Sequence, residues 1–493
     1  MTDEPLTMRQ VTRVVRLPLD PTPDVADILQ RYADCSRACF NFAFGLKDAV
    51  QRRWATERAR LLAEGMEEKE ARKAATALYR VPRQFDLQKM FLAVRDKPLM
   101  GPARAGQDFP RYRYRWWDGV NAIVCQQAFR DADTAWSNWL ARSREGLGYP
   151  RPKQRGRCRD SFRMPAVRLV PEDLRHIRIG GEQRPGGQKA FRVRLHRPAY
   201  RLARLLQRGG EVKMVTISRS GPRWFAAFNV RLPAPPAAVA TRAQRERGTV
   251  GVDLGVAAIA ATSQPLHLQG AATQLVANPR HLNNARRALA KWERRKARRW
   301  VKGRPAREQS KGWHEAKDHV AKLHAQIAAY RADTQHHLTK ALATQFARVV
   351  IEDLKVKNMS KSARGSVEEP GSNVRQKAGL NRALLDVGFG EIRRQLEYKT
   401  AWYGSVLSTV NPAYTSQTCH RCGHVDSKSR RTRSVFVCTA CGAQVHADIG
   451  AAHNIAARGT EADDTRASHR RGGSHPVVTG SAEVANRCST RVS

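Results

Sequence analysis

The chain has 493 residues, which excludes a single ordinary core and predicts several domains. Its formal net charge of +44, from 88 Lys and Arg against 44 Asp and Glu, indicates an extended polyanion such as nucleic acid as the partner. The acidic start lacks the apolar region of a signal peptide, and no apolar run reaches the roughly 18 residues needed to cross a bilayer. We therefore expect a cytoplasmic protein with no membrane partner.

The first half of the chain alternates between strand and helix patterns. Residues 12–19 predict a short strand, and from about 25 to 145 the apolar residues recur with a helical period. Strand alternation returns over 166–232, where "RSGP" predicts the turn of a hairpin. We expect the first strand to join the later ones in a small β-barrel with the helical region inserted. Three cysteines on apolar helical faces are expected to be core residues: Cys35, Cys39 and Cys125.

Basic and aromatic residues interleave in "RYRYRWWDG", residues 111–119. A generally basic surface would explain the net charge, but basic side chains combined with aromatic rings can both neutralise phosphates and stack on bases. This stretch therefore supplies candidate nucleic-acid contacts: Arg111, Arg113 and Arg115.

Residues 233–248 are rich in Pro and Ala and predict a linker at a domain boundary. The next stretch, "TVGVDLGVAAIAATS" (249–263), predicts a pair of buried strands that carries one acid, Asp253. An unpaired buried carboxylate costs several kcal/mol, so this acid requires an explanation.

A strongly basic helical hairpin follows. Between residues 286 and 307, eleven basic residues accompany a single acid, Glu293. Such a helix favours a polyanion alongside it, and the returning helix has an apolar face that predicts packing. Four residues of the basic helix are candidate nucleic-acid contacts: Arg294, Arg295, Arg298 and Arg299.

A later buried strand, 347–354, ends in Glu352 and Asp353. Side chains alternate along a strand, so these acids point to opposite faces and only one can share a site with Asp253. Three further elements are expected, a mobile lid, a helix and a strand, at residues 360–376, about 380–400 and 405–412.

Two Cys-x-x-Cys pairs stand 15 residues apart: Cys419, Cys422, Cys438 and Cys441. A redox pair is the alternative for one such motif, but two at this spacing supply four thiolates for tetrahedral Zn²⁺. Four cysteines close the coordination shell, so we expect structural rather than catalytic zinc. Nearby histidines are then expected to face solvent or nucleic acid: His420, His424 and His446.

Asp448 follows the last cysteine by seven residues and opens an Ala-rich helix, where an acid is most often an N-cap. Asp253 and one acid of the later strand end buried elements of the same expected sheet. Three converging carboxylates repel one another unless cations lie between them. Carboxylates suit Mg²⁺ or Mn²⁺, and two such ions about 4 Å apart promote phosphodiester hydrolysis.

Four features in order carry a family resemblance: "GVDLG" (251–255), "VVIEDL" (349–354), the four-cysteine ribbon and "HADIGAAHNI" (446–455). They resemble the split RuvC nuclease domain of TnpB, the transposon-encoded RNA-guided nuclease, and of the compact type V CRISPR effectors. The basic hairpin and the stretches at 149–164 and 378–404 extend the resemblance over roughly residues 10–458. The chain departs from the family at Gly450, where members often have Asn.

The resemblance implies an α+β multidomain protein. It implies an N-terminal wedge β-barrel with an inserted helical recognition domain, and an RNase H-like RuvC domain with an inserted zinc ribbon that contacts the target nucleic acid. In the first half we expect the wedge at 1–24 and 166–232, the recognition domain at 25–165 and the linker at 233–248. In the second half we expect the RuvC domain at 249–415 and 446–458 and the ribbon at 416–445. The tail, 459–493, is expected to be disordered.

The resemblance also implies that Asp253, Glu352 and Asp448 bind catalytic Mg²⁺, and it selects Glu352 over Asp353. The front half is expected to hold a guide RNA and its heteroduplex with double-stranded target DNA, in a prokaryotic cytoplasm or nucleoid. The leading hypothesis is an RNA-guided DNA endonuclease. The alternatives are an RNA-guided DNA-binding repressor with weak or no cleavage, which would be expected to lack one acid, and a protein-only RNase H-like transposase or recombinase. No oligomeric state is predicted.

Overall fold

A computed structural model describes residues 10–95, 120–141, 148–165, 167–170, 172–180, 190–233, 238–366 and 369–469. The chain divides into two compact units, one reaching Ala234 and the other running from Pro235 to Ala482. Both units combine helices and strands, so the protein is an α/β multidomain chain. Across the described residues, every helix is too short or too polar to span a membrane. Three candidate contacts lie outside the described residues: Arg111, Arg113 and Arg115.

The larger sheet of the first unit is antiparallel, in the order β1-β7-β6-β2. Its strands are β1 (Gln10–Pro18), β2 (Ser161–Met164), β6 (Glu211–Ser220) and β7 (Arg223–Pro233). β1 pairs with β7 along its whole length, so the first strand joins strands that follow the helical region. In the turn between β6 and β7, Gly221 has φ 59°, a conformation that favours glycine.

Residues 161–164 correct the boundary expected for the helical region, because they form β2 and pair with β6. Phe162 and Met164 are buried while their neighbours are half-buried, a strand pattern only four residues long. A three-stranded sheet and a short helix complete this unit: β3 (Val167–Val170), β4 (Asp173–Ile179), β5 (Phe191–Arg194) and α5 (Tyr200–Gln207).

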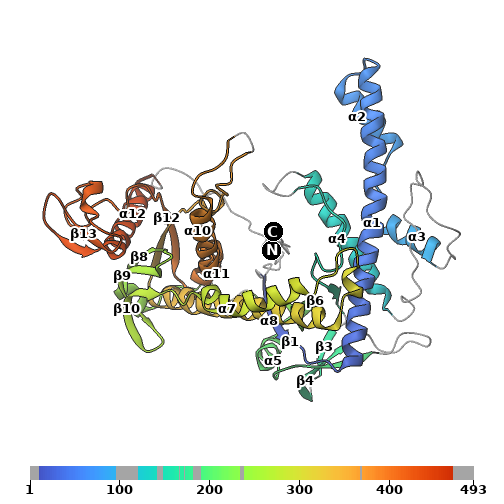
Figure 1. The fold of residues 1–493 in the computed structure, drawn as a ribbon, viewed down its shortest axis with the longest axis horizontal. Helices are drawn as coiled ribbons and strands as arrows, with labels where there is room; N and C mark the ends of the chain where they lie inside the picture. Colours follow the sequence, from blue (N-terminus) through green and yellow to red (C-terminus); the bar gives the residue numbers. More distant parts are fainter. Residues whose placement is uncertain are drawn as a thin grey trace, which may run out of the picture. The chain divides into compact units, whose positions relative to one another are not determined.

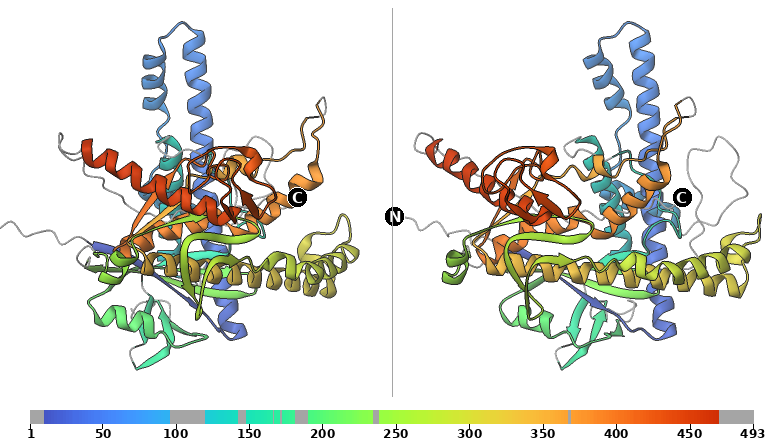
Figure 2. Two further views of the ribbon diagram at one scale, coloured as in Figure 1. Left: turned by 90° about the vertical axis from the view of Figure 1, so that its left-hand side faces the viewer. Right: turned by 60° about the vertical axis from the view of Figure 1, so that its left-hand side comes forward.

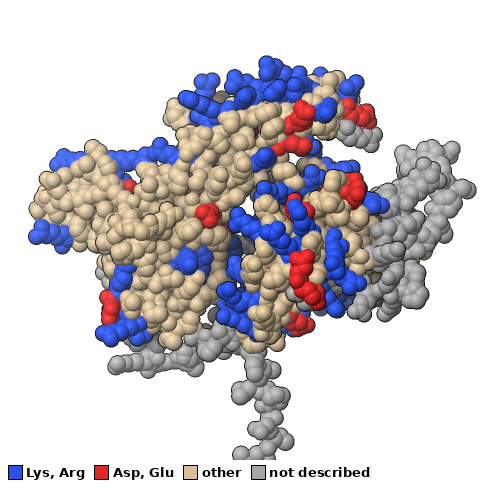
Figure 3. Space-filling model, turned by 90° about the horizontal axis from the view of Figure 1, so that it is seen from below, with Lys and Arg blue, Asp and Glu red and all other residues tan. Residues whose placement is uncertain are grey.

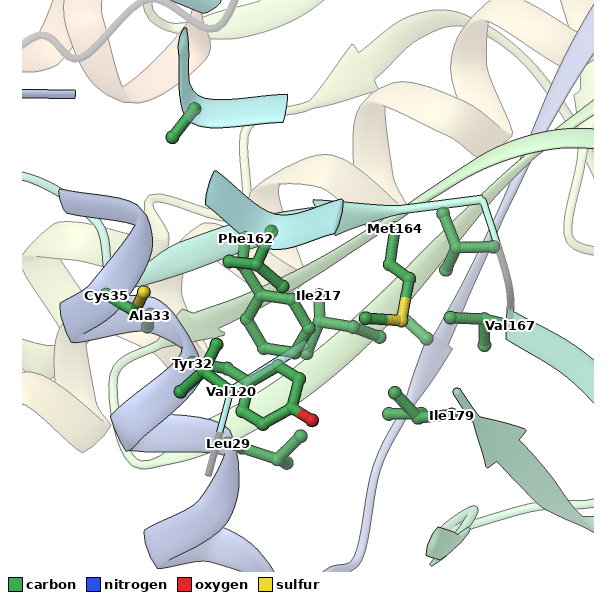
Figure 4. Close-up of a cluster of buried hydrophobic side chains, with 14 of the residues drawn as sticks. Leu29, Tyr32, Ala33, Cys35, Val120, Phe162, Met164, Val167, Ile179 and Ile217 are labelled. Atoms are coloured by element: carbon green, nitrogen blue, oxygen red, sulfur yellow. The ribbon is translucent and has the colours of Figure 1, made fainter. Parts of the chain in front are cut away.

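Four helices separate β1 from β2: α1 (Pro23–Ala63), α2 (Glu68–Leu78), α3 (Gln84–Arg95) and α4 (Ala122–Leu140). One apolar core joins α1, α3 and α4 to both sheets (Figure 4). Within it the rings of Tyr32 and Phe162 lie 5.1 Å apart, and Ile179 and Ile217 are fully buried. The three cysteines expected in the core are buried there: Cys35, Cys39 and Cys125.

The second unit begins with structure where the sequence predicted a linker. Residues 242–247 form α6 (Arg242–Arg247), which is opened by a capping box between Thr241 and Gln244. The Gln244 side chain is buried and donates to Ala343 O at 2.9 Å and Tyr403 O at 3.1 Å. This end of the segment is therefore fixed to the second unit.

The second unit is built on a five-stranded sheet in the order β10-β9-β8-β11-β12. The strands are β8 (Thr249–Asp253), β9 (Ala258–Leu268), β10 (Ala271–Ala277), β11 (Arg348–Glu352) and β12 (Val406–Val410). β8, β9 and β10 are antiparallel, whereas β11 runs parallel to both β8 and β12. The parallel strands β8 and β11 lie side by side at the centre.

Helices cover both faces of this sheet (Figure 1). Val349 and Ile351 of β11 pack in a core with α8 (Lys311–Gln345) and α11 (Phe389–Tyr403). Val350, which points the other way, packs with Ile455 of α12 (Ala447–His469). The sheet is thus sandwiched between helices, with α8 and α11 on one face and α12 on the other.

Two helices form a long antiparallel arm, α7 (His281–Arg298) and α8. The arm extends away from the sheet of this unit (Figure 2). It has a small core of its own formed by Leu289, Val320 and Ile327. The basic helical hairpin that the sequence predicted is this arm.

The single helix expected over about 380–400 is instead two helices, α10 (Val374–Val387) and α11. Gly388 divides them at φ 73°, a left-handed conformation that ends one helix and allows the next to start in a new direction. The helix α9 (Val356–Met359) ends just before the expected lid, and the described residues of the lid include the bridge between Gly365 and Pro370 and the start of α10.

The last elements within the described residues are a small hairpin, β13 (Val435–Val437) with β14 (Gln444–His446), and the helix α12 that follows it. α12 continues to His469 rather than ending at 458, which corrects the expected start of the tail. Gly459 is a residue that weakens helices, but within α12 it lies directly against Val350, and no proline follows before Pro476, so the helix continues past it.

Candidate functional site

Asp253 and Glu352 end two neighbouring strands that run in the same direction. In the parallel pairing of β8 with β11, Val252 lies opposite Ile351, so the residues that follow, Asp253 and Glu352, lie at the same edge of the sheet. The two acids are 99 positions apart in the sequence and adjacent in the structure because parallel strands share their carboxyl-terminal edge.

Helix α12 carries Asp448 to this edge. A Cβ atom at Gly251 would overlap Ala452 O and lie 2.5 Å from Ala456 N, so β8 and α12 approach at a distance that only glycine permits. Asp448 precedes Ala452 by about one helical turn, and Asp253 lies two residues beyond Gly251. Close packing of small residues therefore sets where Asp448 lies relative to Asp253.

The three acids influence one another electrostatically. Burial, followed by the charges of Glu352 and Asp448, raises the pKa of Asp253 to about 7, against the opposing effect of Arg430. Burial also raises the pKa of Glu352, although a hydrogen bond from Thr415 opposes this. A cation among these carboxylates would favour their ionised forms.

The carboxylates nevertheless stand apart from one another. Among the described residues, only two groups bring three or more potential ligand atoms within 4.8 Å, and both consist of cysteines. Three carboxylates are a donor set that Mg²⁺ or Mn²⁺ accepts.

A short hydrogen-bond chain holds Glu352. Thr415 Oγ1 donates to Glu352 Oε1 at 2.6 Å. Asn454 of α12 fixes the backbone on either side of this contact, because its Nδ2 donates to Thr415 O at 2.8 Å and to Thr418 O at 2.7 Å. The helix that carries Asp448 thereby also fixes the residue that orients Glu352.

Arg430 reaches Asp448 from the ribbon, with Arg430 Nη2 lying 3.2 Å from Asp448 Oδ1. A small pocket adjoins this pair and is lined by Asp448, His446, Arg433 and Leu275 among others. Three of these residues are not site candidates from the sequence alone: Arg430, Thr415 and Asn454. Only Asn454 has a sequence signal, since it lies within the stretch "HADIGAAHNI".

Asp353 faces away from the three acids. It accepts from Lys355 Nζ at 2.7 Å and from Arg393 Nη1 of α11 at 2.6 Å. Lys355, then Arg393, lower the pKa of Asp353, whereas the pKa of Glu352 is raised. The two neighbouring acids therefore occupy opposite sides of the strand end.

The four ribbon cysteines form one cluster, with all four sulfur atoms within 4.8 Å of one another. Cys419 Sγ lies 3.7 Å from Cys441 Sγ, and Cys422 Sγ lies 3.6 Å from Cys438 Sγ. Zn–S bonds of about 2.3 Å separate tetrahedral sulfurs by roughly 3.8 Å, so the cluster fits Zn²⁺. The Cys441 amide donates to Cys438 Sγ and, together with the Ala440 amide and the neighbouring thiols, lowers the pKa of Cys438 to about 6. Hydrogen bonds with the other thiols raise the pKa of Cys422, so the protons are shared unequally within the cluster.

The nearby histidines lie outside this thiol cluster. His420 stacks on His453 of α12 with ring centroids 5.2 Å apart, and His446 Nδ1 accepts from Asp448 N at 3.3 Å. At Gly450, a Cβ would lie 3.0 Å from Val445 Cγ1, so a larger side chain there requires Val445 to move.

The four candidate basic residues on the arm lie at the end of α7. Arg294 donates to Ala290 O and Arg299 to Gly312 O, so uncharged backbone oxygens hold these two guanidinium groups. Lys and Arg prevail over Asp and Glu on the molecular face in Figure 3. The remaining two candidates, Arg295 and Arg298, belong to the last turn of the same helix.

Two family models match the second unit and the strand before it. "Probable transposase" covers residues 228–363, and "Cas12f1-like, TNB domain" covers residues 389–455. The first spans β8, the arm and β11, and the second spans α11, β12, the ribbon and the start of α12. Together the two models include all three acids and all four ribbon cysteines.

Relatives with curated names match most of the chain. The chain is 37% identical over 346 residues to "Putative RNA-guided DNA endonuclease InsQ" of Escherichia coli (strain K12), covering 70% of this chain and 76% of the relative. It is 31% identical to "Putative RNA-guided DNA endonuclease" of Streptomyces pristinaespiralis, covering 70% and 73%. A solved structure, "Cryo-EM structure of the Cas12f1-sgRNA-target DNA complex", aligns with a TM-score of 0.41 at 14% identity, covering 91% of this chain and 99% of that one.

The family models and the curated relatives define the class of the protein as a transposase-related nuclease. The chain belongs to the TnpB family.

Proposed function

We propose that this protein is an RNA-guided DNA endonuclease that hydrolyses phosphodiester bonds of target DNA at Asp253, Glu352 and Asp448. Family membership supports the activity, and the net charge of +44 supports nucleic acids as partners. The observation that carries the proposal is the meeting of three acids, from β8, β11 and α12, at one edge of a five-stranded sheet.

The proposed chemistry depends on divalent ions. Mg²⁺ or Mn²⁺ held by the three carboxylates would supply an activated water and stabilise the leaving oxygen of the cut strand. Other residues of the chain hold and orient these carboxylates. Thr415 fixes one oxygen of Glu352, and Arg430 balances part of the charge of Asp448. Fixed carboxylates lose little freedom when an ion binds, which favours affinity.

The ribbon is proposed to be a structural zinc site. Four thiolates leave no coordination position for water or substrate, so the zinc would stabilise the ribbon rather than react. The ribbon contributes Arg430 to Asp448, and its entry segment contributes Thr415 to Glu352. Zinc would thus act on cleavage indirectly, by holding both contacts in place.

The domain roles also belong to this proposal. The first unit would supply a wedge barrel and a helical recognition domain for the guide RNA and its heteroduplex, with β2 counted in the barrel. The sheet of the second unit would be the RNase H-like RuvC domain, with the zinc ribbon contacting target DNA. The α7–α8 arm would place basic residues on nucleic acid: Arg294, Arg295, Arg298 and Arg299.

The test begins with expression of the gene with its native flanking DNA, purification of the protein and sequencing of the RNA that accompanies it. A discrete RNA with a constant scaffold and a variable end is expected. The loaded protein should then cut a plasmid carrying the matching target in Mg²⁺, whereas Asp253→Ala should bind RNA and target normally without cutting, because a metal ligand acts on the chemistry and not on phosphate contacts.

The same experiment decides between the three hypotheses. A wild-type complex that binds the target in Mg²⁺ and leaves it intact would favour the repressor. Cleavage that survives RNase treatment of the protein before target is added would favour a protein-only transposase or recombinase. Loss of RNA binding together with cleavage in Asp253→Ala would contradict the role given to that acid.

A further inference from the structure

Trp300 lies exposed at the tip of the α7–α8 arm. It is the second residue after α7 ends at Arg298, and 46% of its surface is accessible. The arm behind it is rigid, because its helices share a core at Leu289 and Val320, and Trp292 stacks on His319 with ring centroids 3.8 Å apart. The exposed indole ring of Trp300 is thus held at the end of a well-packed helical hairpin.

The backbone of the tip is ordered by a buried side chain. Gln309 is only 5% exposed; its Oε1 accepts from Val301 N at 2.9 Å and its Nε2 donates to Val301 O at 2.9 Å and Arg304 O at 2.8 Å. Ser310 caps α8 by accepting from Trp313 N at 3.3 Å. The loop therefore holds Trp300 in one place before any ligand arrives.

The Trp300 ring is supported on one side and accessible elsewhere. The buried ring of Trp313 lies 5.5 Å from it at an interplanar angle of 47°. Lys317 Nζ lies 5.4 Å from the Trp313 ring and adds positive charge at this base. An indole fixed in this way offers an aromatic surface at little entropic cost.

The charge around Trp300 selects the ligand. Arg298, Lys302 and Arg304 are exposed within four residues of it. An apolar protein partner would have to desolvate these cations, whereas a nucleic-acid strand places phosphates on them and a base on the ring. The tip combines the two features that single-stranded nucleic-acid sites use, an aromatic platform and cations spaced along a backbone.

We infer that Trp300 is a stacking platform for an unpaired nucleobase of the bound nucleic acid, with Arg298, Lys302 and Arg304 on the adjoining phosphates. The inference rests on the proposed function for its ligand, which is a strand of either the guide RNA or the target DNA. Stacking on one ring is tolerant of base identity, so the site positions a strand and does not read its sequence.

The test compares Trp300→Ala, Trp300→Phe and the control Trp402→Ala. Trp402 on α11 is a matched control because 45% of its surface is accessible and its ring packs 4.6 Å from Tyr398. We would measure the affinity of each protein for the RNA that accompanies the wild type, and then the affinity of each loaded complex for target DNA. Trp300→Ala should weaken one of these affinities by about 5- to 150-fold, and Trp300→Phe should retain most of it, because a smaller ring still stacks.

The dependence of affinity on salt concentration separates stacking from charge. Trp300→Ala should leave this dependence unchanged because it removes no cation, whereas the double variant Lys302→Gln with Arg304→Gln should make it less steep. Weaker RNA affinity assigns the base to the guide RNA, and weaker affinity only for target DNA assigns it to the target. Unchanged affinity for both in Trp300→Ala, or an equal loss in Trp402→Ala, overturns the inference.

These outcomes are distinguishable from failure of the proposed function. If the wild-type protein carries no discrete RNA and cuts no target, the proposed function fails first. If the wild type binds RNA and cuts while Trp300→Ala behaves like the wild type in both affinity measurements, only the stacking site is wrong. If Trp300→Ala folds poorly, Trp300→Leu replaces it, because leucine keeps an apolar side chain beside Trp313 but has no ring on which a base can stack, and it should show the same loss of affinity.

Discussion

Gly251 of β8 lies directly against the backbone of Ala452 in α12. A Cβ at 251 would overlap Ala452 O and lie 2.5 Å from Ala456 N. A second glycine acts from the helix side, since a Cβ at Gly459 would lie 2.7 Å from Val350 Cγ1 of β11. The helix that carries Asp448 therefore packs closely on the strands that carry Asp253 and Glu352, because the two contact positions are glycines with no room for a side chain.

Gly251→Ala should therefore lower both stability and cleavage. Its methyl group meets backbone atoms, which cannot rotate away, so α12 must shift; overpacking of this kind costs about 1–3 kcal/mol. Gly390→Ala is the control, because a Cβ there meets nothing within 4 Å. Thermal unfolding and the rate of target cleavage would be measured for both variants. Equal behaviour of the two would contradict the close seating of α12.

Glu352 and Asp353 allow a test with neighbouring acids. Glu352→Gln should reduce the cleavage rate by roughly 10³-fold or more, because loss of a metal ligand removes several kcal/mol of transition-state stabilisation. Asp353→Asn should cut at nearly the wild-type rate, since Asp353 pairs with Lys355 and Arg393 on the other side of the strand end. The rates would be compared at saturating Mg²⁺. A slow Asp353→Asn with an active Glu352→Gln would reverse the assignment.

The assignment of Glu352 and Asp353 could be predicted only in part from the order of residues along the strand. Alternation along a strand established that only one acid could share a site with Asp253, but it could not say which, because strand alternation does not reveal which face meets α12. The structure separates them by their partners, Thr415 for Glu352 and Arg393 for Asp353. Both partners come from segments distant in the sequence, and no local sequence pattern predicts them.

The cysteine cluster was the most predictable feature. Cys-x-x-Cys pairs are local motifs, so their geometry depends on little beyond the two turns that hold them. The break at Gly388, the strand β2 and the helix α6 were missed for a common reason. Each is short, and tertiary packing rather than a sustained period stabilises it.

Arg430, like Thr415, is a functional candidate that only tertiary structure could reveal, because it precedes Asp448 by 18 positions and a hairpin lies between them. Arg430→Ala should slow cleavage by about 10- to 100-fold, the usual effect of removing a partner that orients a metal-binding side chain. Arg431→Ala, on the same loop, is the control and should have a small effect. Zinc content should stay unchanged in both, so a zinc-deficient Arg430→Ala would mean that the ribbon itself was damaged.

Cys438→Ser tests the zinc cluster. The wild type is expected to hold about one zinc ion per chain. The variant should lose most of this zinc and unfold at lower temperature, because metal binding contributes directly to folding of such ribbons. Cys158→Ser is the control, since Cys158 lies outside both thiol clusters. Elemental analysis and thermal unfolding provide the readouts. A zinc-free Cys438→Ser with wild-type stability and cleavage would contradict the structural role.

The raised pKa of Asp253 predicts how stability depends on pH when no divalent ion is added. The pKa of this carboxyl group is about 7 in the folded chain and near 3.8 in the unfolded chain, where the carboxyl group is solvated and lacks these neighbours. Below 3.8 its proton is bound in both states and its stabilising contribution is fully present. As pH rises toward 7 the unfolded chain releases the proton first, so this contribution falls and is lost above the folded pKa.

Asp253→Asn removes this titration, so the fall in unfolding temperature between pH 5 and 7.5 should be less steep in the variant than in the wild type. Glu352, whose pKa is also raised, keeps some slope in both proteins. Added Mg²⁺ should stabilise the wild type most at the high end of this range, because it binds the ionised carboxylates, and should stabilise Asp253→Asn less. Parallel pH profiles for the two proteins would show that Asp253 ionises normally and that the three acids lie in a more solvated site than the sheet edge indicates.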